Sequence, residues 1–288
     1  MRKHFKLRVH HYILFALILI SATFLVIQPL FPTNLPFVKK KNAPIPVDQF
    51  DFAVLNETGK PEESVSQNWW LNSGGIVNFS NNTLSTNQGS INSNSKWFKA
   101  YLTSNPQDTD GGLHPQNLFR LVSKNNLQNI EQSVLFKINR TIMSKSPNRN
   151  ASNGILFFNR YNDGDNLYYT GVRVDGTGII KKKKSGIYNT VAQNPVFEGS
   201  YNINKQPNLL PENKWIGLKS EVKNLSFKDV SLKVYIDKNN NGNWELIAEA
   251  IDTGDKYNGA SFINAGRFGI RTDFMDVEFM NFKVKNLN

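Results

Sequence analysis

Cysteine is absent from this chain of 288 residues, and histidine is rare. Without cysteine the protein has no disulfide, no thiolate nucleophile and no cysteine-ligated zinc site. Three of the four histidines, His4, His10 and His11, lie near the amino terminus, which leaves His114 alone in the rest of the chain. A single histidine does not make a histidine-rich zinc centre, so that class of site is excluded as well.

Several motifs that mark particular chemistries are also missing. The sequence has no P-loop, no dinucleotide fingerprint and no G-x-S-x-G elbow. We therefore expect neither nucleotide binding nor Ser-His-Asp catalysis. After Leu30 no segment keeps a 3.6-residue apolar period long enough for a sizeable helix.

Positive charge is concentrated at the amino terminus. The formal net charge is +11, but residues 1–41 hold seven of the 34 lysines and arginines and none of the 23 acidic residues. The remainder is mildly basic, with one dense run of lysines at residues 181–184. This distribution does not indicate nucleic-acid binding.

An uninterrupted apolar run at residues 12–31 follows a basic segment at residues 1–11. At about 1.5 Å per residue the run is long enough for a hydrocarbon core about 30 Å thick. No small-x-small site follows it, which favours an uncleaved transmembrane signal anchor over a removed signal peptide. The basic residues before the run predict a single-pass membrane protein whose body is extracytoplasmic. The proline-containing residues 32–61 are interpreted as a stalk.

The body, residues 62–288, is predicted to be one all-β domain, an antiparallel β-sandwich. Short apolar or alternating segments are separated by Asn, Gly, Asp and Ser, which is typical of sandwiches and barrels. The candidate strands are residues 75–79, 96–102, 118–124, 133–139, 154–159, 167–174, 178–184, 215–223, 231–237, 244–251, 267–271 and 277–285.

One predicted hairpin turn also resembles the start of a calcium loop. Asp237, Asn239 and Asn241 stand at loop positions 1, 3 and 5, and Gly242 follows at position 6. The carboxylate expected at position 12 is missing, because that residue is Ala248. A plain hairpin is favoured over a structural calcium site, and no other cofactor is indicated.

The lysine run belongs to the predicted strand at residues 178–184. Successive side chains of a strand face opposite sides of the sheet, so both faces become cationic. We expect neither face to be buried, and the run to mark where the strand leaves the core. Two interpretations stay open: a solvated strand end, or one wall of a site for an acidic ligand.

Basic and aromatic residues on neighbouring strands favour a site. If the three strands between residues 154 and 184 are neighbours, their side chains project within about 5 Å of one another. Tyrosine rings beside guanidinium and ammonium groups suit an acidic glycan. The predicted ligand-binding residues are Arg160, Tyr161, Tyr169, Arg173, Lys181, Lys183 and Tyr188.

With these features the body resembles the concanavalin A-like lectin/glucanase superfamily of jelly rolls, and in particular its laminin-G-like domains. The resemblance covers about residues 69–284. It rests on "GILFFNRYNDGDNLYYTGVRVDG", "WIGLKSEVKN", "VYIDKNNNGNWELIAEA" and "GRFGIRTDFMDVEFMNFKV". It implies a jelly-roll sandwich that binds carbohydrate. The E-x-D-x-x-E triplet of laminarinase-type relatives and the motifs of jelly-roll alginate lyases are not present, so no catalytic residues are assigned.

We therefore expect a membrane-tethered module that binds polysaccharide, with a preference for acidic chains. The alternative is a polysaccharide lyase or glycoside hydrolase with a divergent active site. In a lyase, Tyr188 or His114 would act as the base. His114 follows Asp108 and Asp110, two carboxylates that could instead hold calcium. An adhesive protein whose partner is another protein is a third interpretation.

Overall fold

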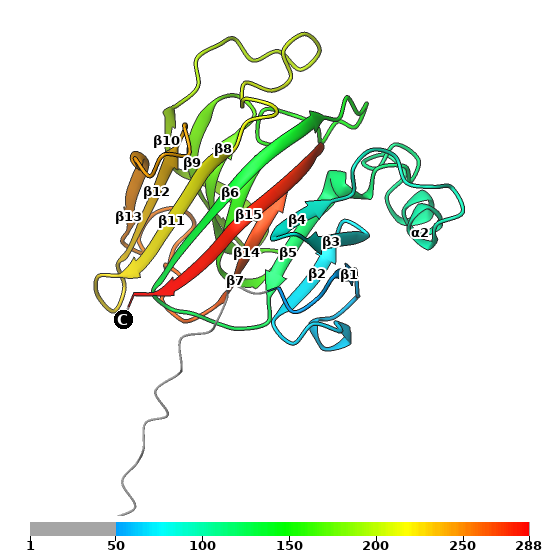
Figure 1. Cartoon of the computed structure of the whole chain (residues 1–288). Coiled ribbons are helices and arrows are strands. Elements are labelled where there is room, and N and C mark those ends of the chain that lie inside the picture. Colours follow the sequence, from blue (N-terminus) through cyan, green and yellow to red (C-terminus); the bar gives the residue numbers. More distant parts are fainter. Residues whose placement is uncertain (1–49, 288) are drawn as a thin grey trace, which may run out of the picture. The chain divides into compact units, whose positions relative to one another are not determined.

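The computed structural model describes residues 50–287, which form two antiparallel β-sheets packed face to face (Figure 1). The strands are β1 (Val54–Asn56), β2 (Trp69–Ser73), β3 (Ile76–Ser80), β4 (Thr83–Thr86), β5 (Phe119–Ser123), β6 (Ile130–Thr141), β7 (Gly154–Asp163), β8 (Asn166–Arg173), β9 (Thr177–Lys184), β10 (Ile187–Pro195), β11 (Ile216–Asn224), β12 (Val230–Asp237), β13 (Glu245–Asp252), β14 (Arg267–Thr272) and β15 (Met275–Asn286). The helices are the 3-10 turns η1 (Pro61–Glu63) and η2 (Pro115–Leu118) and the α-helix α2 (Lys96–Ser104).

The eight-stranded sheet has the order β1-β3-β4-β15-β6-β11-β12-β13, and the seven-stranded sheet has the order β10-β9-β8-β7-β14-β5-β2. Their facing sides enclose a core that includes Trp69, Phe136, Phe157 and Phe279. Strand β6 alternates buried and half-buried residues over most of its length, which is the pattern of a strand with one face on a core. The predicted all-β antiparallel sandwich is confirmed for this part of the chain.

The folded domain begins earlier than predicted. β1 pairs with β3, with Leu55 opposite Val77, and its residues lie within the segment interpreted as a stalk. The ring of Phe50 lies 5.2 Å from that of Trp69, so the chain contacts the core even before β1. Proline content and weak periodicity concealed this edge strand, because three residues are too few for alternation to be visible.

The segment predicted as a strand at residues 96–102 is instead the helix α2. Ser95 caps it by accepting a hydrogen bond from the backbone N–H of Trp97 at 3.2 Å. The helix is fastened to β1, since the indole of Trp97 donates to Asn56 and Tyr101 donates to the Glu57 carboxylate. Local capping and these contacts outweigh the β propensity of the aromatic residues.

The predicted transmembrane segment, residues 12–31, lies outside the residues that the structure describes. Among residues 50–287 no helix combines the length and the apolar character that a membrane crossing requires.

The seven-stranded sheet has a second, outer apolar face. Along β8 the side chains of Tyr168 and Val172 belong to the core between the sheets, whereas those of Leu167 and Tyr169 belong to a separate cluster. That cluster includes Trp70, Phe158 and Tyr161 and lies on the side turned away from the eight-stranded sheet. We call this side the outer face; it carries the candidate site.

Candidate ligand-binding pocket

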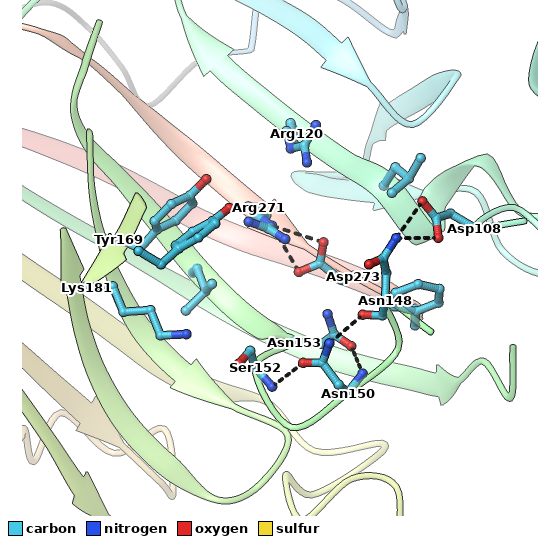
Figure 2. A pocket seen from close by; sticks show the side chains of 14 residues that line it. Asp108, Arg120, Asn148, Asn150, Ser152, Asn153, Tyr169, Lys181, Arg271 and Asp273 are labelled. Atoms are coloured by element: carbon cyan, nitrogen blue, oxygen red, sulfur yellow. Dashed lines mark hydrogen bonds and ion pairs between the residues drawn. The ribbon is translucent and has the colours of Figure 1, made fainter. Parts of the chain in front are cut away.

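The main pocket is a hollow of about 420 Å³ on the outer face. Its lining combines cationic, aromatic and amide side chains. Some come from strands of the seven-stranded sheet and others from the segments that connect strands (Figure 2). The lining residues are Asp108, Leu118, Arg120, Asn148, Asn150, Ser152, Asn153, Leu156, Tyr169, Lys181, Tyr188, Arg271, Asp273 and Phe274.

Strand register brings the cations of the main pocket together. Arg271 of β14 lies opposite Arg120 of β5, and Lys181 of β9 lies opposite Tyr169 of β8. Residues directly opposite in an antiparallel pair point to the same face of the sheet. The three cations therefore surround one hollow although they are 151 residues apart in sequence at most.

Arg271 is neutralised within the pocket, whereas Arg120 and Lys181 are not. The Nε atom of Arg271 lies 3.0 Å from both carboxylate oxygens of Asp273. Within residues 50–287 no carboxylate forms an ion pair with Arg120 or Lys181, and Figure 2 shows no interaction between either cation and its neighbours in the pocket. Burial lowers the pKa of Lys181, and so do the charges of Arg173 and Arg271. An anion in the pocket would relieve this repulsion.

Two tyrosine rings line the pocket beside these cations. The rings of Tyr169 and Tyr188 stack at 6.0 Å with an angle of 27° between their planes, and the guanidinium of Arg271 lies 5.3 Å from the Tyr169 ring. Burial raises the pKa of Tyr169 to about 12. Burial also acts to raise the pKa of Tyr188, but the charges of Arg271 and Lys183 outweigh it and place that pKa below 10.0. Half of the surface of Tyr188 is exposed, so its ring is available to a ligand.

The opposite wall of the pocket is a polar loop before β7. Asn148 donates to the Asp108 carboxylate at 3.0 Å, Asn150 donates its backbone N–H to Asn153, and Ser152 donates its backbone N–H to Asn150 (Figure 2). These contacts hold the loop in a fixed shape while amide groups face the hollow. Amides donate to and accept from hydroxyl groups, which suits a polyhydroxylated ligand.

A second hollow of about 250 Å³ adjoins the main pocket, and we call it the side pocket. It shares Arg120, Tyr169 and Tyr188 with the main pocket and adds Tyr161 and Lys183. The Lys183 ammonium lies 4.9 Å from the Tyr188 ring and pairs with the carboxylate of Asp165 at 2.8 Å. Because the two hollows share a wall, they provide adjacent positions for two consecutive parts of one extended ligand.

The structure therefore brings five of the predicted residues, Tyr161, Tyr169, Lys181, Lys183 and Tyr188, to these two hollows. The other two, Arg160 and Arg173, line neither, so their predicted position in the site is wrong.

Arg160 has a structural position inside the protein. Arg160 is 1% exposed. Its guanidinium donates to the carbonyls of Phe262 and Asn264 and to the side chain of Asn224. A positive φ of 50° at Arg160 and a break in the β7–β8 register take the side chain out of the simple alternation that the prediction assumed. The guanidinium holds the segment before β14.

Arg173, the last residue of β8, contacts the polar loop of the pocket without lining the hollow. Its side chain pairs with Asp175 at 2.7 Å and donates to the carbonyl of Ala151 at 2.8 Å. The contact with Ala151 fixes the polar loop against the end of β8, and the pair with Asp175 holds Arg173 to the turn that follows β8. Arg173 is thus close to the site without facing the hollow.

The lysine run does not leave the core, contrary to prediction. Lys182 is fully buried, and its ammonium pairs with Asp252 at 2.8 Å. The alternation was predicted correctly, since Lys181 and Lys183 face the pockets. On the opposite face of β9, the Asp252 carboxylate at the end of β13 neutralises Lys182 and makes the burial of its charge tolerable.

Sequence reasoning missed Arg120 on β5, Arg271 on β14 and the amides of the polar loop. Arg271 carried a usable signal, because it stands between the buried residues Ile270 and Thr272 in the strand "RFGIRT". Arg120 stands in the same way between the buried residues Phe119 and Leu121 in "FRLVS". The amides carried none, because asparagine is common in every loop of this chain.

The proposed calcium ligands Asp237, Asn239 and Asn241 line a separate polar depression at the β12–β13 hairpin. The Asp237 carboxylate accepts backbone N–H groups from Asn239, Asn241 and Gly242, which is the role of a turn-forming side chain. Among residues 50–287 no group of three or more His, Asp or Glu side chains is arranged to hold a metal ion.

Comparisons with known proteins give only distant likenesses. No family model matches the sequence, and no curated protein matches it. Among solved structures, a carbohydrate-binding module from Bacillus subtilis aligns with a TM-score of 0.47 and 13% identity, covering 76% of this chain and 95% of that one.

Two other solved structures align less closely. An endo-β-1,4-glucuronan lyase from the fungus Trichoderma reesei has a TM-score of 0.36 and 7% identity, covering 83% of this chain and 92% of that one. A GH43 protein from Bacillus licheniformis has a TM-score of 0.34 and 12% identity over 57% of this chain, which spans only 29% of its length. Scores this low assign neither family nor activity, and the concanavalin A-like resemblance stays a prediction.

Proposed function

We propose that the outer face binds an acidic polysaccharide across the main and side pockets. The observation that carries this proposal is the position of Arg120 and Lys181. These two cations form no ion pair with a carboxylate of residues 50–287, and they line a hollow that is also lined by Tyr188 and by amides. Arginine and lysine bind carboxylates or sulfates through charge-assisted hydrogen bonds. The half-exposed tyrosine ring supplies an apolar surface for the face of a sugar ring, and the amides suit its hydroxyl groups.

Binding of fluorescent oligosaccharides by the full chain in detergent, followed by fluorescence anisotropy, tests the proposal. We expect an oligouronide to bind more tightly than a neutral glucan of equal length. Arg120→Ala and Lys181→Ala should each lower its affinity about tenfold, the loss expected for one charged hydrogen bond. The matched control is Lys223→Gln, which removes an exposed cation from β11 in the other sheet. Equal affinity for the oligouronide and the neutral glucan would contradict the proposal. So would an unchanged oligouronide affinity in the Arg120→Ala/Lys181→Ala double variant.

A lyase reaction is the second candidate, favoured by the lowered pKa of Tyr188 beside Arg271 and Lys183. In this reaction the Tyr188 phenolate removes the proton from the carbon that bears a uronate carboxylate. The electron pair forms a carbon–carbon double bond as the adjacent glycosidic C–O bond breaks, and the leaving oxygen takes the proton from Tyr188, which restores the phenolate. Arg120 or Lys181 neutralises the carboxylate. New ultraviolet absorbance from unsaturated products, lost in Tyr188→Phe, would establish it. Stable binding without this absorbance would leave a binding module.

Membrane attachment is proposed on the sequence alone, from the apolar run at residues 12–31 and the basic residues before it. We expect the full chain to stay with membranes during alkaline extraction. Protease added to intact cells should remove the body. Release by alkali, or full protection from protease, would contradict this topology.

A further inference from the structure

Ser90, His114 and Asp110 form a continuous line of hydrogen bonds at a site outside both pockets. The hydroxyl of Ser90 lies 2.9 Å from Nε2 of His114, and Nδ1 of the same ring lies 2.8 Å from Oδ2 of Asp110. This is the order of nucleophile, base and carboxylate in serine hydrolases. The absence of a G-x-S-x-G elbow led us to expect no such arrangement, because that motif describes only one of the folds that build it.

The carboxylate of this line is held from its other side. Ser144 donates to Oδ1 of Asp110 at 2.6 Å, and Asn117 donates to Oδ2 at 3.3 Å. Asp110 has a φ of +52°, an uncommon conformation for a residue other than glycine. Strained residues of this kind persist where the surrounding structure determines their position. The carboxylate is therefore fixed before any ligand arrives.

The contacts also determine which ring nitrogen carries the proton. A carboxylate only accepts, so Nδ1 of His114 carries the hydrogen, and in the neutral imidazole Nε2 presents its lone pair to Ser90. The histidine side chain is 15% exposed, whereas Ser90 is exposed. A substrate can therefore reach the serine while the histidine is held in the orientation of a general base.

We propose that Ser90, His114 and Asp110 form a hydrolytic triad that cleaves esters of short acyl groups. Ser90 Oγ bonds to the ester carbonyl carbon as its proton moves to His114 Nε2. The carbon–oxygen bond to the alcohol then breaks, and the alcohol leaves with that proton. Water attacks the acyl-serine, gives a proton to His114 and releases the carboxylic acid, after which the proton returns to Ser90.

The surroundings of Ser90 define the substrate class. Its own backbone N–H has no hydrogen-bond acceptor among residues 50–287, which leaves it available to an oxyanion, as the nucleophile's N–H is in serine proteases. Ile91 and Leu113, the sequence neighbours of Ser90 and His114, are joined by a 2.9 Å backbone hydrogen bond. Neither pocket of the outer face contains Ser90 or His114. An exposed serine outside both hollows leaves room for a large alcohol, and its neighbours Ile91 and Leu113 suit a short apolar acyl group, independently of the polysaccharide proposal.

Covalent labelling of the full chain tests the triad directly. The probe is an alkyl fluorophosphonate, which reacts with activated serine, and the adduct is located by peptide mass spectrometry. We expect the adduct on Ser90, with a labelling rate about 100-fold lower in His114→Gln because the general base is lost. The matched control is Ser93→Ala, an exposed serine near Ser90 that should change nothing. Hydrolysis of p-nitrophenyl acetate should follow the same pattern and disappear in Ser90→Ala.

Asp110 acts through His114, so its test uses Asp110→Asn, which favours the wrong imidazole tautomer while preserving shape. We expect slow labelling of Ser90 with an unchanged melting temperature. Absence of an adduct on Ser90 in the wild type, or equal labelling rates in the wild type and in His114→Gln, would overturn the proposal. Melting temperatures of all variants distinguish a lost triad from a lost fold.

Discussion

Lys182 and Asp252 form an ion pair in the interior of the sandwich, with Nζ 2.8 Å from Oδ2 and both side chains fully buried. The pair joins β9 of the seven-stranded sheet to the end of β13 of the eight-stranded sheet. Tyr168 donates its hydroxyl to the same carboxylate oxygen at 2.6 Å. The lysine ammonium also donates to the carbonyl of Gly259. Each buried polar group is thus satisfied by another, which makes burial of the charges tolerable.

Removing one member of this pair should strongly destabilise the domain. Asp252→Asn or Lys182→Met is expected to lower the free energy of unfolding by about 3 kcal/mol, because it leaves an uncompensated buried charge. Urea unfolding followed by tryptophan fluorescence measures the change. Lys184→Met is the control on the same strand, since the Lys184 ammonium donates to Ala260 near the surface. A cost for Lys184→Met equal to that for Lys182→Met would contradict the special role of the buried pair.

Arg160→Ala should weaken folding without weakening ligand binding. Its guanidinium donates three hydrogen bonds within the protein, two of them to backbone carbonyls, so we expect a loss of about 2 kcal/mol in stability. The dissociation constant for an oligouronide should not change below the melting temperature, because Arg160 lines neither pocket. Loss of affinity in a fully folded Arg160→Ala variant would contradict the structural assignment.

Tyr188 should ionise at a lower pH than its neighbour Tyr169. Its folded pKa lies below 10.0 because the charges of Arg271 and Lys183 outweigh burial, whereas burial raises the pKa of Tyr169 to about 12. The tyrosinate absorbance that appears below pH 10 in the wild type should be smaller in Tyr188→Phe. Lys183→Gln should move this step to higher pH. Tyr235→Phe is the control, because the pKa of Tyr235 is raised by burial.

The same shift predicts how stability depends on pH. Between the folded pKa of Tyr188 and its unfolded value near 10.0, the unfolded chain holds a proton that the folded protein has lost. The free energy of unfolding should therefore rise with pH across that window. This contribution is fully present above pH 10 and is lost as the pH falls through the folded pKa. If the free energy of unfolding changed with pH equally in the wild type and in Tyr188→Phe across this window, the assignment to Tyr188 would be contradicted.

Binding of the acidic oligosaccharide should weaken as salt increases. Arg120 and Lys181 attract the ligand through charge, and added salt screens charges at the surface. Tyr188→Ala should lower the affinity at every salt concentration by about fivefold, because it removes a half-exposed ring worth about 1 kcal/mol. Anisotropy titrations at several salt concentrations separate the two effects. A salt-independent affinity would show that charge does not guide binding.

The sequence predicts the fold class because its signals are local. Turn residues such as Asp175-Gly176 and alternating strands such as β6 indicate an antiparallel β protein without long-range information. The same alternation places Lys181 and Lys183 on one face, which the structure confirms as the outer one. The helix α2 was missed because its boundary depends on a cap at Ser95 and on contacts with β1.

The composition of the site depends on which strands become neighbours. Arg120 and Arg271 meet only because β14 lies between β5 and β7, a relationship between segments about 150 residues apart. Arg160 leaves the face on which alternation placed it because of its positive φ, and Lys182 enters the core because Asp252 is there to receive it.

Sequence by itself thus determined the β architecture and the face of each strand in regular segments, since both follow from backbone geometry and local hydrogen bonding. Tertiary structure alone decided which cations share a pocket, which lysine is buried, and that Ser90, His114 and Asp110 meet. These outcomes require contacts between segments that are distant in sequence. Such contacts stabilise the protein only once the two sheets have packed.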